Sequence, residues 1–170
     1  MNELLEALLD SWDRNNTIMV GLLRALPTGG LEARATVDSP TVAALFMHVC
    51  HVRLCTICET DSEFARNHLG LIPADDQEWL EEHDFDRIEQ RLNDSAKVLR
   101  DAVQSWLEAG LITSRLELGY DHPILLLQHM IWHEGYHVGQ MKLALKLTGL
   151  PMTDQQAGAV TWNVWRRHKQ

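Results

Sequence analysis

Three histidines recur every four residues in the segment HMIWHEGYHVGQ, residues 129–140. Because four residues make about one helical turn, His129, His133 and His137 fall on one face of a helix. Two histidines at this spacing can share one metal ion. With Glu134 between them, they match the H-E-x-x-H motif of zinc metalloproteases. The segment therefore predicts a metal site and raises the question of which enzyme class it serves.

The residues that follow do not fit a metalloprotease. One large class takes its third zinc ligand from a histidine after a glycine turn, but here Gly139 comes one place early and Leu143 stands where that histidine would be. Another class uses a downstream glutamate, whereas the only acid after Val138 is Asp154. Strand patterns, whose edges would align a peptide substrate, are nearly absent. The motif thus lacks the rest of a protease.

A carboxylate di-iron centre does not fit either. Glu134 and His137 form one Glu-x-x-His motif, but such a centre needs a second copy and further glutamates on neighbouring helices. We find no second copy. The sequence therefore predicts a mononuclear site whose third ligand lies upstream.

One upstream segment, VAALFMHVCHVRL, carries histidines well inside an apolar stretch. His48 lies on its apolar stripe and should face the interior, while His51 projects partly to the same side. If this helix neighbours the one that carries the motif, His48 joins His133 and His137 around one metal ion. Three neutral imidazoles would leave the fourth coordination position open, as catalytic sites require.

Five nearby residues are candidates for other roles. His51 and His129 are alternative ligands or contacts to the ligands, and Gln140 is a further contact candidate. On a helix Glu134 points about 100° away from the preceding histidine, so we expect it on the helix surface or between helices. Glu134 and Tyr136 are the candidates for a catalytic side chain, which the sequence does not otherwise identify.

The elements that must position these residues are helices. Ser39-Pro40 resembles an N-cap followed by proline in the first turn of a helix. Gly110 resembles the left-handed residue that ends a helix, and the residues from Thr153 to Gln156 match a capping box. A weak strand signal covers only residues 111–118. Apolar spacing and these boundaries predict one domain over residues 1–170. The predicted fold is an all-α four-helix bundle with an additional short C-terminal helix. The predicted helices cover residues 2–26, 40–67, 84–109, 121–148 and 153–165.

Composition narrows the functional classes. The formal net charge is −9 and the pI is about 5.4, which argues against nucleic acid and anionic membranes as partners. The N-terminus does not resemble a signal peptide, and no run approaches a membrane span. Cys50, Cys55 and Cys58 fit buried thiols in a reducing cytoplasm better than disulfides or a redox pair.

Two segments, LFMHVCHVRL and LLLQHMIWHEGYHVGQMKLALKLTGLP, resemble the DinB/YfiT-like superfamily of bacterial proteins. Its members share a four-helix bundle with one histidine on the second helix and a His-x-x-x-His, followed by Gly-Gln, on the fourth. The resemblance implies metal ligands at His48, His133 and His137. Members often have a histidine or arginine beside the last ligand, where this chain has Tyr136 and Val138, a departure that concerns the surroundings of the ligands.

The resemblance also implies a range of activities. Some members look like metal-dependent hydrolases, and others transfer low-molecular-weight thiols, bacillithiol or mycothiol, to electrophiles or use them in isomerisation. We therefore expect a cytoplasmic metalloenzyme with Zn²⁺ or Ni²⁺ at the three histidines, a small-molecule substrate and a homodimeric assembly. The alternative is a non-catalytic, dimerising stress-response module, in which His51 or His129 would have to complete a structural metal site.

Overall fold

The structure, a computed structural model, describes residues 3–68, 79–110 and 120–166. Within these residues the chain forms helices and no strands, which confirms the predicted all-α fold. The possible strand over residues 111–118 lies outside the described residues. The helices are α1 (Glu3–Arg24), α2 (Val42–Thr60), α3 (Ser62–Arg66), α4 (Phe85–Glu108), α5 (Pro123–Leu147), α6 (Asp154–Val160) and α7 (Trp162–Trp165).

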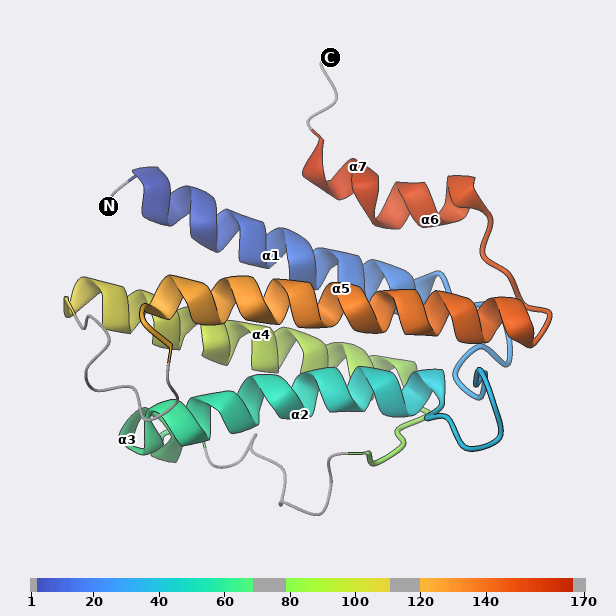
Figure 1. The fold of residues 1–170 in the computed structure, drawn as a ribbon, viewed down its shortest axis with the longest axis horizontal. Helices are drawn as coiled ribbons and strands as arrows, with labels where there is room; N and C mark the ends of the chain where they lie inside the picture. The colour runs from blue at the N-terminus through green and yellow to red at the C-terminus, as the bar shows by residue number, and fades with distance from the viewer. Residues whose placement is uncertain (1–2, 69–78, 111–119, 167–170) are drawn as a thin grey trace.

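The four long helices α1, α2, α4 and α5 form the bundle (Figure 1). α2 packs along α4, α4 packs along α1, and α5 packs against α1, α2 and α4. α1 and α5 run in one direction and α2 and α4 in the other, as the colour gradient shows. α2 and α4 are thus parallel to each other and antiparallel to α1 and α5. The short helices α6 and α7 pack on α1.

Two helix boundaries differ from the prediction at α2. Thr41, rather than Ser39, is the N-cap, and its side chain accepts a hydrogen bond from the Ala44 N–H. The predicted extension of this helix to residue 67 is wrong, because Asp61 adopts a non-helical conformation and caps α3 by accepting from the Phe64 N–H. A short polar side chain there competes with the helix for backbone donors.

The other boundaries follow the sequence signals closely. Gly110 has a φ of 64° at the end of α4, the left-handed conformation that glycine adopts without strain. The capping box of Thr153 and Gln156 is present at the start of α6. The predicted C-terminal helix is divided in two, because the backbone of Thr161 leaves the helical region between α6 and α7.

The second helix is the most deeply buried. By length and hydropathy α2 could cross a membrane, yet 78% of its apolar window is buried inside the bundle. Two of its buried side chains can nevertheless carry a positive charge, His48 at 7% exposure and Arg53 at 0%. Burying a charged group is costly unless it is paired. Both residues therefore need partners from a neighbouring helix, and α5 supplies them.

Candidate metal centre

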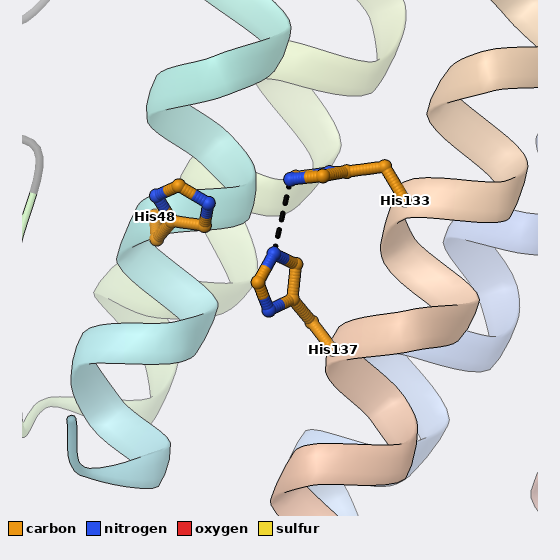
Figure 2. Close-up of side chains that lie close together, drawn as sticks. All are labelled: His48, His133 and His137. Atoms are coloured by element: carbon orange, nitrogen blue, oxygen red, sulfur yellow. Dashed lines mark hydrogen bonds between the residues drawn. The ribbon is translucent and has the colours of Figure 1, made fainter. Parts of the chain in front are cut away.

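Two helices bring three histidine side chains together. His48 extends from α2, and His133 and His137 extend from adjacent turns of α5 toward it, as Figure 2 shows. One ring nitrogen from each residue lies within 4.8 Å of the others, and the Nε2 atoms of His133 and His137 are 3.0 Å apart. The prediction that the second and fourth long helices are neighbours is confirmed, and so is the predicted convergence of these three side chains.

The cluster has the donor set and size of a mononuclear metal site. With metal–nitrogen bonds of about 2.0–2.1 Å, two imidazoles in a tetrahedral site have their nitrogens about 3.3 Å apart. The His133–His137 pair already stands near that separation. The ring nitrogen of His48 lies within 4.8 Å of both. The three histidines therefore fit a divalent cation, and imidazole ligands suit Zn²⁺ and Ni²⁺.

Burial keeps these imidazoles neutral. Desolvation, followed by repulsion from His137 and His51, lowers the pKa of His48 to about 4. Desolvation and repulsion from neighbouring charged groups, with His137 first among them, lower the pKa of His133 to about 4. The pKa of His137 is also lowered by burial, against the opposing effect of its hydrogen bond to Gln140. At neutral pH all three rings present the form that binds metals.

A hydrogen-bond chain behind His137 selects its tautomer. The Nε2 of Gln140 donates to the hydroxyl of Tyr136 at 3.0 Å, which leaves its Oε1 facing the Nδ1 of His137 at 2.7 Å. Since that oxygen can only accept, the ring proton sits on Nδ1 and the lone pair of Nε2 points into the cluster. Such contacts to a ligand's outer nitrogen fix its orientation and raise its basicity.

An indole ring lies against the remaining histidine. Trp79 stacks on His48 with ring centroids 4.2 Å apart and an interplanar angle of 2°. Trp79 is 47% exposed, so it lies between solvent and the cluster. It also lines a surface pocket of about 380 Å³ together with Arg34 and Ala44, which is one helical turn before His48. The pocket shares Trp79 with the cluster but is not lined by any of the three histidines.

Glu134, the residue that completes the protease motif, takes part in a buried ion pair with Arg53. Its carboxylate is fully buried and accepts hydrogen bonds from Nε and Nη2 of Arg53, both at 2.6 Å, and from the amide of Asn15 at 2.6 Å. Burial lowers the pKa of Arg53, but attraction and hydrogen bonding from Glu134 outweigh it and raise the pKa. Glu134 is therefore an interhelix residue that joins α5 to α2 and α1.

Arg53 was not among the predicted site residues, although the charge pattern of the sequence indicated its role. It is the only Asp, Glu, Lys or Arg residue between Val42 and Cys58, and Glu134 is the only acidic residue of α5. A single cation and a single anion, each on an apolar helix, must pair when the helices pack, because an unpaired buried charge is strongly destabilising.

The other predicted contact candidates occupy separate positions. His51 places its Nε2 3.1 Å from the Sγ of Cys55, and His129 places its Nδ1 2.5 Å from the hydroxyl of Tyr120. Gln140 contacts His137 directly, as described above. Tyr136 is 55% exposed and reaches the cluster through Gln140.

The three cysteines form no disulfide. Cys50 is buried, and Cys55 and Cys58 are partly exposed. Burial is the largest influence on Cys50 and raises the pKa of its thiol to about 11, so this residue stays protonated and unreactive.

Comparison with known proteins agrees with the bundle and its histidines. The sequence matches the DinB family over residues 1–163. No curated protein and no solved structure matches it. Since the family match covers nearly the whole chain and the helices and histidine positions fit it, the chain belongs to the DinB family.

Proposed function

We propose that this protein is a metal-dependent enzyme that binds one Zn²⁺ or Ni²⁺ ion through His48, His133 and His137. The observation that carries the proposal is the convergence of three buried ring nitrogens, one per side chain, within 4.8 Å. Burying three imidazoles without a ligand costs desolvation of each ring. Coordination of a metal ion compensates for that cost. The hydrogen bond from His137 to Gln140 supports the same assignment.

A cation held by three neutral imidazoles keeps its full charge and lowers the pKa of a water or thiol bound beside them. The protein's own part is to hold the three rings, orient His137 through Gln140, and cover His48 with Trp79. The activity that this arrangement supports is activation either of a low-molecular-weight thiol for transfer to an electrophile or of water for hydrolysis.

A structural metal site is the competing explanation, and the surroundings favour the enzyme. A structural site needs four protein ligands, and the two further histidines proposed for that role are engaged elsewhere. His51 contacts Cys55, and His129 contacts Tyr120. Among the described residues, the potential metal-binding group consists of three histidines. The fourth position is then left for a substrate or solvent molecule.

The pocket beside Trp79 favours a small-molecule substrate. Its volume of about 380 Å³ lies within the range of small-ligand sites. The guanidinium of Arg34 suits a carboxylate, and Asp38 and Glu81 suit an ammonium group. Cysteine and bacillithiol carry both groups, so we favour thiol transfer in the cytoplasm with bacillithiol as the cosubstrate. Mycothiol, whose cysteine is N-acetylated and amide-linked, carries neither group and is the alternative cosubstrate.

The thiol proposal is tested with the metal-loaded protein, a thiol and a fluorogenic haloalkyl electrophile. Cysteine, bacillithiol and mycothiol are compared, and formation of the thioether adduct is followed by fluorescence. With the unmodified protein, we expect at least one thiol to react faster than it does in buffer alone. With His137→Ala, the same thiol should react only at the buffer rate. If each of the three thiols reacted no faster with the unmodified protein than in buffer, thiol transfer would be contradicted. Hydrolysis of ester substrates would then be tested with the same pair of proteins.

A further inference from the structure

A histidine and a cysteine form a contact on α2 that is separate from the three-histidine cluster. The Nε2 of His51 lies 3.1 Å from the Sγ of Cys55, because side chains four residues apart on a helix lie on the same face. Both side chains are partly exposed, on a helix most of whose residues are buried. An imidazole within hydrogen-bond reach of a sulfur is an arrangement by which proteins activate a thiol as a nucleophile.

The ring of His51 directs a proton toward this sulfur. Its Nδ1 is buried, and among the described residues it has no hydrogen-bond partner. A buried N–H without an acceptor carries a desolvation cost, so the neutral ring keeps its proton on Nε2. The sulfur of Cys55 is then the acceptor, and a thiolate accepts a hydrogen bond more strongly than a thiol does. The contact therefore favours the ionised, nucleophilic form of Cys55.

The other two cysteines have different surroundings. Burial raises the pKa of the Cys50 thiol to about 11. Cys58 lies in the last turn of α2, where the negative end of the helix dipole disfavours a thiolate. The residue one turn before Cys58 is Leu54, whose side chain has no proton to donate. Among the three cysteines, only Cys55 therefore has an imidazole one turn earlier on the helix.

One carboxylate on α2 opposes a thiolate at Cys55. Glu59 lies one turn further along the helix, but its side chain is exposed, so solvent and salt screen its charge. The same residue directly follows Cys58, so it does not favour that cysteine over Cys55. The hydrogen bond from His51, which is direct, is therefore the effect that distinguishes the two partly exposed thiols.

We propose that Cys55, assisted by His51, is a second reactive site of this protein, a nucleophilic thiolate that adds covalently to activated carbon–carbon double bonds. The ligand class is that of the α,β-unsaturated carbonyl compounds, whose β-carbon is a soft electrophile. Neither residue belongs to the group of three converging histidines. The proposal rests on the contact in α2 alone, so it stands or falls separately from the proposed metal chemistry.

The addition needs no further reactant. Cys55 loses its proton to solvent, and the sulfur anion accepts the hydrogen bond from the Nε2–H of His51. The anion forms a bond to the β-carbon of the electrophile, while the π electrons of the double bond move to the carbonyl oxygen and give an enolate. The enolate takes a proton from solvent at its α-carbon. The net change is the addition of the sulfur and one hydrogen across the double bond, and His51 returns unchanged.

The test is alkylation of the full chain by N-ethylmaleimide, an activated alkene, at neutral pH, with each cysteine followed separately. Samples are quenched with dithiothreitol at low conversion, so that one adduct does not alter the rate of the next, and are digested with trypsin. Cleavage after Arg53 separates Cys50 from the other two cysteines. Fragmentation of the peptide that ends at Arg66 then distinguishes an adduct on Cys55 from one on Cys58 by mass.

In the unmodified protein we expect Cys55 to react about tenfold faster than Cys58, since a hydrogen bond to a charged group is stronger than one to a neutral group. Cys50 should not react, and it reports on folding because unfolding would expose it to the reagent. Equal rates at Cys55 and Cys58 would overturn the proposal, and this comparison requires no variant.

His51→Leu removes the donor and should slow the reaction of Cys55 about tenfold, while the rate at Cys58 stays the same. Val52→Ala, a change at the neighbouring, partly exposed position of α2, is the matched control and should leave both rates unchanged. A His51→Leu variant in which Cys50 remains unreactive and Cys55 reacts as fast as in the unmodified protein would also overturn the proposal.

Discussion

At the scale of single residues, the metal site depends on three imidazoles that burial keeps neutral. His48 and His133 have a pKa of about 4, lowered chiefly by desolvation. The glutamate of the motif that suggested a protease contributes no metal-facing group, because Glu134 is buried against Arg53. The proposed catalysis therefore depends on the three histidines and on the metal ion and the thiol or water that would bind there.

These pKa values predict how the metal-free protein responds to acid. A histidine in the unfolded chain has a pKa near 6.5, so between pH 6.5 and about 4 the unfolded state takes up protons that the folded state does not. Stability is thus fully present above pH 6.5 and falls as the pH drops toward 4, by up to about 1.4 kcal/mol per pH unit for each group. Urea unfolding of chelator-treated protein at pH 7.5 and 5 measures this loss.

His48→Ala provides the comparison for that measurement. The variant lacks one of the protonation sites that favour the unfolded state, so its free energy of unfolding should fall less between the two pH values. An identical fall in both proteins would contradict a lowered pKa at His48.

The Gln140 contact predicts a second effect at this scale. Gln140→Leu removes the acceptor for the Nδ1 proton of His137 and should weaken metal binding about 10- to 100-fold. Competition with a fluorescent chelator measures the affinity. Gln128→Leu, an exposed position on the same helix, should leave it unchanged. Equal affinities for the two variants would show that Gln140 does not orient the ligand.

At the scale of elements, the three histidines converge because α2 and α5 keep a fixed register. The ion pair of Arg53 and Glu134 joins these two helices, and both side chains are fully buried. Arg53 comes five residues after His48 on α2, and Glu134 directly follows His133 on α5. Asn15 of α1 binds the same carboxylate. The pair therefore acts as a positioning device for the rings without contacting a ligand.

Removing one partner of this pair should be far more damaging than replacing both. Glu134→Leu leaves the guanidinium of Arg53 buried without its carboxylate and should cost about 3–5 kcal/mol in the free energy of unfolding. The double variant Arg53→Met with Glu134→Leu should recover much of that loss. Denaturant unfolding of the metal-free proteins gives the comparison, and a double variant no more stable than Glu134→Leu would argue against the pairing.

The existence of these helices was predictable from the sequence, whereas some of their ends were not. Apolar periodicity extends through Asp61, but the helix ends there because this side chain caps α3 and accepts a hydrogen bond from Trp106. That choice depends on α4, which local sequence patterns do not contain. The convergence of His48 with the motif was predictable only because helical spacing and family resemblance indicated the same pairing. The Trp79 stack had no sequence signal.

At the scale of the whole molecule, a metal ion bound at the three histidines would link helices that are distant in the chain. His48 and His133 are separated by α3, α4 and their connections. A ligand that binds only the folded state raises the free energy of unfolding with the logarithm of its concentration relative to the dissociation constant. The bundle should therefore be measurably more stable with metal than without.

Saturation with metal predicts a defined thermal shift. At 100 times the dissociation constant, binding adds about 2.7 kcal/mol, which corresponds to about 5–10 °C in melting temperature for a domain of this size. Differential scanning fluorimetry with Zn²⁺ and Ni²⁺ measures the shift, and His137→Ala should show none. A shift of equal size in the variant would place the stabilising ion elsewhere.

The most direct test of the metal site is elemental analysis of purified protein. Unmodified protein produced with added zinc and nickel should hold about one ion per chain, because three neutral imidazoles converge on one point. His48→Ala and His137→Ala should each retain less than about a tenth of that amount while their circular dichroism stays helical. Negligible metal in the unmodified protein, or equal metal in all three proteins, would contradict the account.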